Sequence, residues 1–326
     1  MIASLTRRDA LSLSLMATLT AASGNISRAF ASTINSRQSF IKANAMPFGV
    51  QLYALGPELA HTLNASLAIL AQAGFETVEP AGYLGRTATQ LRVAFDHAGL
   101  RCTSAHFGSP QPGPEPNLIT SLGRVIDDAH ILGLEYVVTP IFRIPDRYAS
   151  GPATDETTWD YMRRVARGMT IEDWKRTAHF LNITGEQLKH HGLTLAYHNH
   201  NPEFAPVGGT NGFEVLINYT DPHLVKLELD AGWAFAGGQN PATLLRAYPD
   251  RFRLVHVKDV KATTKTNYQF DQDPIEVGGG ALIWPEILRA AKASGVKYYY
   301  VEQEPPFSGD RMESVLKSYK YLESIN

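Results

Sequence analysis

The chain has 326 residues, of which 44% are hydrophobic and 19% charged, a balance typical of a globular protein. Its 30 Lys and Arg residues against 32 Asp and Glu give a net charge of −2, which argues against a nucleic-acid binder that relies on a large basic face. The single cysteine, Cys102, excludes an intrachain disulfide framework and a cysteine-based zinc site. No apolar run reaches the roughly 20 residues needed to span a bilayer.

The first 31 residues have the features of an export signal. Arg7 and Arg8 precede a weakly apolar stretch over 10–22, and residues 29–31, Ala-Phe-Ala, match a signal peptidase site. Adjacent arginines before such a stretch indicate twin-arginine export, although an ordinary secretory signal with a chance arginine pair has the same outline. We therefore expect a signal over 1–31, a linker over 32–46, a folded domain over 47–326, and a periplasmic or otherwise exported protein.

From Phe48 onward, eight short apolar runs alternate with amphipathic stretches. The runs resemble strands of a parallel sheet buried on both faces, and several amphipathic stretches end at a glycine in the position of a helix cap. The predicted strands are Phe48–Tyr53, Thr77–Pro80, Arg101–His106, Tyr136–Pro140, Leu193–His198, Val225–Asp230, Leu254–Lys258 and Tyr298–Glu302. The predicted helices are Pro57–Ala73, Thr87–His97, Asn117–Leu132, Ile171–His191, Pro241–Tyr248, Ile283–Ala293 and Asp310–Glu323.

Eight strands separated by helices predict an α/β fold, a single (β/α)8 TIM barrel over 47–326. A doubly wound open sheet is the alternative, but no glycine-rich nucleotide fingerprint follows the first strand. The longest irregular stretch, about residues 141–170, follows the fourth strand and carries five arginines. At the top of a barrel, such a loop is either a lid over the site or a solvated insertion.

Titratable side chains end most of the predicted strands. Barrel active sites lie at the carboxyl ends of strands, so we expect these side chains to form one site, although each alone also fits an interior hydrogen-bonded group. Imidazole and carboxylate ligands without a thiolate favour one Mn²⁺, Zn²⁺, Co²⁺ or Fe²⁺ ion over Mg²⁺ or Ca²⁺. The residues are Glu79, His106, His198, His200, Asp230, His256, Lys258, Asp259, Glu302 and Glu304.

Five segments carry a resemblance to a known family: LAYHNHNPEF, VKLELDAGW, RFRLVHVKDV, VGGGALIW and YYYVEQE. From about Phe48 to the C-terminus, the chain resembles the xylose isomerase-like TIM barrel superfamily. Within it, the chain resembles the sugar phosphate isomerase/epimerase family, whose members often carry twin-arginine signals. The resemblance implies a divalent metal ion held by His198, Asp230, His256 and Glu302. His198 is a departure, because many relatives have glutamate there, and this weakens the case for epimerisation by two metal-bound glutamates.

The resemblance implies a metal-dependent isomerase or epimerase that acts on a sugar or keto-sugar through an enediolate. The alternatives are a metal-dependent lyase that performs β-elimination on 3-keto-glycosides, and a non-catalytic exported carbohydrate-binding barrel. We expect a small carbohydrate as the partner, no nucleic acid and no membrane span, with homo-oligomerisation left open. The expected catalytic residues are Glu302 as the base, with His106 and His200 next and Lys258 at the oxyanion; the expected substrate contacts are Glu79, Tyr53 and Trp233.

Overall fold

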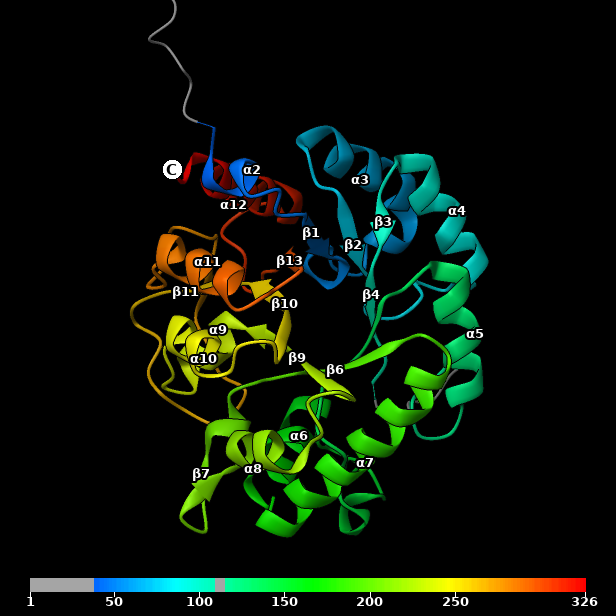
Figure 1. Cartoon of the computed structure of the whole chain (residues 1–326), viewed down its shortest axis with the longest axis vertical. Helices are drawn as coiled ribbons and strands as arrows, with labels where there is room; N and C mark the ends of the chain where they lie inside the picture. The colour runs from blue at the N-terminus through cyan, green and yellow to red at the C-terminus, as the bar shows by residue number, and fades with distance from the viewer. Residues whose placement is uncertain (1–37, 109–114) are drawn as a thin grey trace, which may run out of the picture. The chain divides into compact units, whose positions relative to one another are not determined.

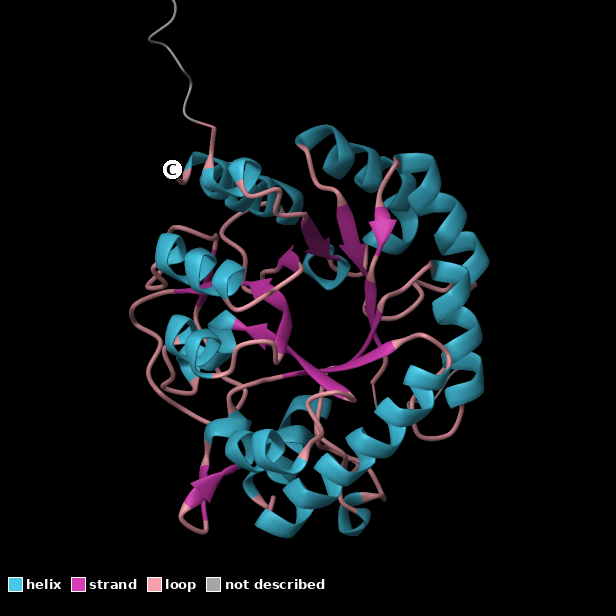
Figure 2. Ribbon diagram, in the orientation of Figure 1, coloured by secondary structure: helices cyan, strands magenta, loops and turns pink. Residues whose placement is uncertain are grey.

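The computed structural model describes residues 38–108 and 115–326, so the predicted export signal lies outside the described residues. Residues 40–325 form one compact unit, in which helices surround a ring of strands (Figures 1 and 2). In the described ranges, no helix is both long and apolar enough to cross a membrane. The strands of the ring are β1 Phe48–Gln51, β2 Thr77–Glu79, β3 Arg101–Cys102, β4 Ser104–His106, β5 Tyr136–Thr139, β6 Thr194–His198, β9 Val225–Asp230, β10 Phe252–Val257 and β13 Tyr298–Val301.

The sheet closes on itself into a barrel. Its strand order is β3-β2-β1-β13-β10-β9-β6-β5-β4, and every neighbouring pair is parallel. Strands β3 and β4 are two halves of one strand separated by Thr103, and the bridge between Ala81 and His106 completes the ring. The predicted (β/α)8 barrel is therefore confirmed, and the open doubly wound sheet is excluded.

The helices outside the ring follow the amphipathic stretches of the sequence. Gly74, Gly99 and Gly133 end three of them in the left-handed conformation, where a glycine meets no Cβ penalty. The helices are α2 Phe40–Ala43, α3 Leu59–Ala73, α4 Ala88–Ala98, α5 Leu122–Leu132, α6 Thr158–Arg167, α7 Ile171–His190, α8 Gly212–Tyr219, α9 Ala231–Ala236, α10 Pro241–Ala247, α11 Trp284–Ala293 and α12 Arg311–Ser324.

Two segments are more ordered than their sequences indicated. The stretch over 141–170 is not irregular throughout, because it contains helix α6, in which only Tyr161 and Val165 are buried. Because most of its other apolar residues are only partly buried or exposed, this helix lacks a clear buried stripe. Residues 40–43, which the sequence analysis placed in the linker, form α2, where the Phe40 amide donates to the Ile325 carbonyl of the C-terminal segment.

The barrel interior has an aromatic layer below a polar layer. Tyr136, Leu254, Tyr298 and Tyr300 belong to a buried cluster separate from the main core between the strands and helices. Because side chains alternate along a strand, the next inward residues are His256 after Leu254 and Glu302 after Tyr300. The Tyr300 hydroxyl is hydrogen-bonded to Ser104 Oγ at 2.8 Å and so joins the two layers. The polar layer is the part of the barrel that carries the candidate site.

Candidate active site

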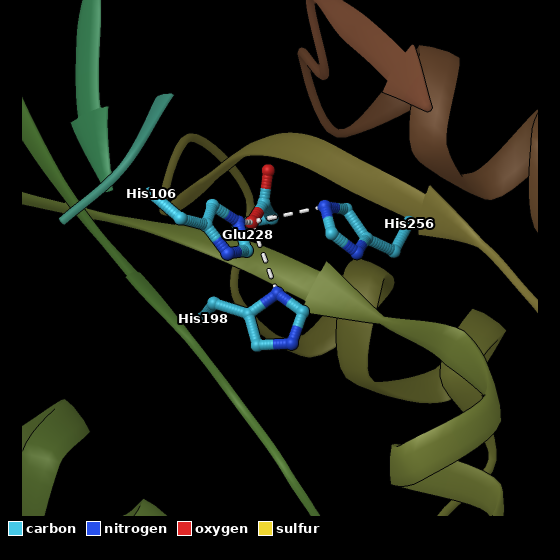
Figure 3. Close-up of side chains that lie close together, drawn as sticks. All are labelled: His106, His198, Glu228 and His256. Carbon is cyan, nitrogen blue, oxygen red and sulfur yellow. Dashed lines mark hydrogen bonds and ion pairs between the residues drawn. The ribbon is translucent and has the colours of Figure 1, made fainter. Parts of the chain in front are cut away.

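Three imidazoles converge on one buried carboxylate inside the barrel (Figure 3). His106 of β4, His198 of β6 and His256 of β10 each direct a ring nitrogen at Glu228 Oε2 of β9. The distances are 2.8 Å from His106 Nε2, 2.9 Å from His198 Nδ1 and 3.2 Å from His256 Nε2. His198, Glu228 and His256 are buried, and the His106 side chain is 10% exposed. We call these four residues the histidine group.

A second polar group shares His256 with the first. His256 Nδ1 lies 2.8 Å from Glu302 Oε2 and 3.9 Å from Asp230 Oδ2. Asp230, His256 and Glu302 form what we call the carboxylate group. Lys258 lies among these carboxylates, with Nζ at 2.8 Å from both Asp230 Oδ2 and Glu302 Oε2. Its ammonium is also 2.7 Å from Glu304 Oε1, so this lysine is paired with three carboxylates.

Both groups have the donor set of a transition-metal site. In each, one ligand atom per residue can be chosen so that these atoms lie within 4.8 Å of one another. Imidazole nitrogens and carboxylate oxygens suit Zn²⁺, Co²⁺, Fe²⁺ or Mn²⁺. Glu228 Oε1 is buried and has no hydrogen-bond partner among the described residues, which is costly for a carboxylate unless a cation binds it. The residues present therefore fit a divalent ion.

Glu79 lies behind the histidines and balances their charge. Its carboxylate accepts hydrogen bonds from Gln51 Nε2 at 2.9 Å and from the Ser104 hydroxyl, and His256 Nε2 is 2.7 Å away. Burial opposes the charged form of Glu79, but His106 and His256 outweigh burial and hold the Glu79 pKa well below its usual range. Burial likewise opposes the cation on His106, yet Glu79 and Glu228 raise the His106 pKa to about 9.

The other site residues divide into charged and neutral groups. Burial opposes the charged forms of Lys258 and Glu302. Asp230 and Glu302 nevertheless raise the Lys258 pKa, and Lys258 and His256 hold the Glu302 pKa well below its usual range. Burial and Lys258 lower the pKa of His200 to about 3, so its imidazole is neutral at pH 7. Burial and the neighbouring His256 also lower the pKa of His198. His198 and His200 are thus neutral imidazoles near a paired ammonium, whereas Glu228 and Glu302 raise the pKa of His256 against the opposing effect of burial.

A cavity of about 330 Å³ opens above the two groups. His200 Nδ1 is buried there and has no hydrogen-bond partner among the described residues. His200 itself lines the cavity, and its neutral ring is therefore a candidate proton acceptor for a ligand there. Residues that line the cavity include Tyr53, His106, Trp159, His198, His200, Lys258, Glu302 and Glu304.

The structure brings most of the predicted site residues together, but in an arrangement that differs from the expected one. The four predicted metal ligands divide between the two groups: His198 belongs to the histidine group, Asp230 and Glu302 belong to the carboxylate group, and His256 belongs to both. The catalytic candidates Glu302, His200, Lys258 and His106 all line the cavity. Their roles stay predictions.

Two of the three expected substrate contacts do not reach the cavity. Tyr53 lines it and is 47% exposed. Glu79 is fully buried, and its carboxylate contacts His106 and His256. Trp233 is also buried, and its Nε1 donates to Glu304 Oε1 at 3.1 Å. Glu79 and Trp233 therefore support the residues around the cavity instead of lining it.

Two acidic residues, Glu228 and Asp259, have roles that the sequence analysis did not assign to them. Glu228 was missed, although it is two residues before Asp230 and therefore faces the same side of β9. Asp259, one of the strand-end candidates, has a structural role: it accepts hydrogen bonds from the amides of Gly278 and Leu282 and from Trp284 Nε1. Asp259 begins the short strand β11 Asp259–Val260, and its side chain is directed at these donors and not at the carboxylates that Lys258 contacts.

The closed parallel barrel, with imidazoles and carboxylates at its carboxyl end, defines a class of (β/α)8 proteins that fit a divalent metal ion. The chain belongs to the xylose isomerase-like TIM barrel family, whose profile matches residues 67–325.

Several known proteins are similar to this chain. Inosose dehydratase 2 of Bacillus cereus is 25% identical over 283 residues, which cover 82% of this chain and 91% of the relative. A sugar phosphate isomerase/epimerase from Parabacteroides distasonis is 28% identical with a TM-score of 0.67, covering 85% of this chain and 93% of that one. The structure of the IolI protein with a zinc atom has a TM-score of 0.55 at 16% identity, over 86% and 98% of the chains, and shares the fold.

Proposed function

We propose that this protein is a lyase that performs β-elimination on a keto-sugar or keto-polyol. The observation that carries the proposal is the neutral imidazole of His200 in a cavity lining that also holds Lys258. A neutral imidazole can take a proton next to a carbonyl, and an ammonium stabilises the negative charge that forms on the carbonyl oxygen. The similarity to proteins named inosose dehydratases, whose name describes loss of water, supports the same reaction class.

The chemistry of the site favours elimination over epimerisation. Epimerisation by two carboxylates needs a carboxylate on each face of the substrate, and β6 ends here in His198 instead of glutamate. Glu302 is the remaining carboxylate of such a pair, and its Oε2 already pairs with His256 and Lys258 at 2.8 Å. The site therefore has one imidazole without a partner, that of His200, and one paired carboxylate, that of Glu302. This combination suits removal of a single proton.

The proposed reaction moves one proton from carbon to the leaving oxygen and needs no oxidant or reductant. His200 takes the proton from the carbon next to the carbonyl, and the electron pair of that C–H bond forms a C=C bond to the neighbouring carbon. The C–O bond on that neighbouring carbon breaks, and the imidazolium returns the proton to the leaving oxygen, which departs as water or an alcohol. A divalent ion held by the site's imidazoles and carboxylates would supply Lewis-acid polarisation of the substrate carbonyl.

The test is incubation of the metal-loaded protein with an inosose and with a nitrophenyl 3-keto-glucoside. Elimination gives a conjugated enone that absorbs in the ultraviolet, with release of water or nitrophenol. An isomeric keto-sugar that keeps its substituent would favour the second candidate, an isomerase or epimerase, which the 28% identity to a sugar phosphate isomerase/epimerase supports. Saturable binding without any turnover would instead favour a carbohydrate-binding barrel and overturn both catalytic proposals.

A further inference from the structure

We propose that the cavity continues past Tyr53 into a second subsite, where Arg311 binds an anionic group, a carboxylate or a phosphate, on the non-reacting end of the substrate. The inference deepens the proposed function, because it names the class of substrate. It rests on that function only in that a keto-sugar or keto-polyol occupies the main cavity, and binding at the subsite can be measured without turnover.

A second cavity, of about 240 Å³, adjoins the main one. We call it the side cavity. Its lining includes Leu84, Pro305 and Arg311. Three residues line both cavities: Tyr53, Ala81 and Gly82. Because they share this boundary, the two cavities are neighbouring parts of one cleft, and a ligand too large for the main cavity can extend across Tyr53.

The Arg311 guanidinium is available to a ligand in the side cavity. Among the described residues that line this cavity, Arg311 alone carries a charge. It makes no ion pair with any described residue; its Nη1 donates to the Ala54 carbonyl at 3.3 Å, and its Cζ lies 4.5 Å from the centroid of the Phe307 ring. Arg147 and Arg164, in contrast, each pair with a carboxylate at 2.7 Å. A guanidinium has five N–H donors, so most of those on Arg311 remain for an acceptor on a ligand.

The surrounding backbone holds this guanidinium in place. The hydrogen bond to the Ala54 carbonyl fixes one end, and Gly56 packs closely against the other atoms of the group. Gly56 has a φ of +73°, and a Cβ at this position would lie 2.8 Å from Arg311 Nε. Glycine therefore serves both the left-handed backbone and the close approach of the guanidinium. An arginine held in this way loses less conformational freedom when it binds an anion.

Helix stability does not account for an arginine at this position. Arg311 is the first residue of α12, and the Asp310 side chain already caps this helix by accepting from the Glu313 amide. The N-terminal end of a helix carries a partial positive charge, so a cation in the first turn is unfavourable there. An anion bound to Arg311 would remove this unfavourable interaction.

The charges near Tyr53 leave Arg311 as the cation without a carboxylate. Burial raises the pKa of the Tyr53 hydroxyl, and the carboxylates of Glu304 and Glu302 add to this effect. Lys258 and Arg311 oppose it, so both cations lie within electrostatic reach of Tyr53. Lys258 is paired with Glu304 at 2.7 Å and with Glu302 at 2.8 Å. The planar, forked guanidinium of Arg311 matches two oxygens of a carboxylate or a phosphate.

The first experiment measures binding to the full-length protein, purified with its own metal content. Isothermal titration calorimetry at low salt compares three probes: glucose, glucuronate and glucose 6-phosphate. We expect one of the two anions to bind about tenfold more tightly than glucose, the usual effect of a charge-assisted hydrogen bond. The tighter of the two identifies a carboxylate or a phosphate as the preferred group. A wild-type protein without a preference for either anion, or without binding of any probe, would overturn the inference.

The second experiment assigns the preference to Arg311, because Lys258 and a bound metal ion also attract anions. Arg311→Gln and Lys317→Gln each remove one positive charge from α12, but Lys317 is 71% exposed and lines neither cavity. We expect Arg311→Gln to weaken binding of the preferred anion by about tenfold, with little change for glucose. Lys317→Gln should bind all three probes as the wild type does. Equal losses in the two variants, or no loss in Arg311→Gln, would contradict the assignment.

A third measurement needs no variant and decides the matter if circular dichroism shows that Arg311→Gln does not fold. Phenylglyoxal modifies accessible arginines, and mass spectrometry locates the adducts. We expect the preferred anion to protect Arg311 from modification but not Arg176, which is 67% exposed on α7 and lines neither cavity. Equal modification of Arg311 with and without the anion would overturn the inference.

The readouts separate this inference from the proposed function. An anion preference that depends on Arg311, in a protein that turns over no keto-sugar, would support the inference and reject the lyase. Elimination from a neutral inosose by a protein without any anion preference would do the reverse.

Discussion

At the residue scale, the site contains two candidate bases, Glu302 and His200, which differ in how firmly other side chains hold them. Glu302 Oε2 pairs with both His256 and Lys258 at 2.8 Å, and these partners hold its pKa well below the usual range. His200 Nδ1 has no partner among the described residues, and burial and Lys258 lower its pKa only to about 3. His200 is thus neutral and unpaired while Glu302 is held by two cations, so the imidazole is the better placed of the two to remove a substrate proton.

This difference predicts unequal effects of two substitutions on proton exchange. We expect His200→Asn to slow exchange of the substrate's α-proton in deuterated water by about 10²–10⁴-fold, the usual loss for a general base, with bound metal unchanged. Glu302→Gln should slow exchange less and weaken metal binding, because it removes the partner of His256. NMR of the substrate and metal analysis measure the two effects. Exchange at the wild-type rate in His200→Asn would return the role of base to Glu302 or His106.

Glu203, behind the site, provides a second prediction at this scale. Burial raises the pKa of Glu203 from 4.5 to about 7, although the Tyr197 hydroxyl donates to Oε1 at 2.6 Å. The folded-state pKa lies above the unfolded value, so the protonated acid stabilises the fold below about pH 4.5 and loses this effect as the pH rises through 7.

We therefore expect Glu203→Gln, which is neutral at every pH, to gain stability relative to wild type as the pH rises. The gain between pH 4 and 8 should be about 3 kcal/mol from the linkage relation. Urea unfolding at both pH values, with Tyr197→Phe as a second variant, provides the measurement. Parallel pH profiles for the wild type and Glu203→Gln would show that Glu203 is ionised in the folded protein.

At the element scale, the segment between β5 and α7 is fixed to neighbouring elements by hydrogen bonds and forms part of the cavity wall. Arg147 donates to both Asp173 carboxylate oxygens, at 2.9 and 2.7 Å, and Arg163 Nε donates to the Gln269 carbonyl at 2.8 Å. Helix α6 presents Trp159, which is 45% exposed and lines the cavity near Phe270. These contacts favour a cover over the cavity rather than a solvated insertion.

Trp159 should therefore contribute to substrate binding more than to chemistry. An exposed ring at a cavity mouth offers an apolar face to a sugar ring or an aglycone. We expect Trp159→Ala to raise KM several-fold for a nitrophenyl keto-glucoside while kcat changes little. Tyr219→Ala is the control, since Tyr219 is an exposed aromatic residue that does not line the cavity. Equal effects of the two substitutions would argue against a binding role for α6.

At the scale of the whole molecule, we propose that the protein is exported in folded form. The proposal rests on Arg7 and Arg8, which lie outside the described residues, and on the small-residue site at 29–31. Replacing both arginines with lysine should retain the precursor in the cytoplasm, because the twin-arginine pathway requires the pair. Cell fractionation and immunoblotting measure this, and normal delivery of the variant would identify an ordinary secretory signal.

The sequence by itself determined the barrel and the chemical types around its rim. Short apolar runs ending in Asp230, His256 or Glu302 predicted both, because a strand buried on two faces excludes polar residues until its carboxyl end. Only the tertiary structure decided which of these side chains meet. Glu228 lies beside three histidines, Lys258 pairs with Asp230 and Glu302, and Glu79 and Trp233 are buried and do not line the cavity. Such pairings depend on the closure and stagger of strands far apart in the chain, and alternation along one strand cannot specify them.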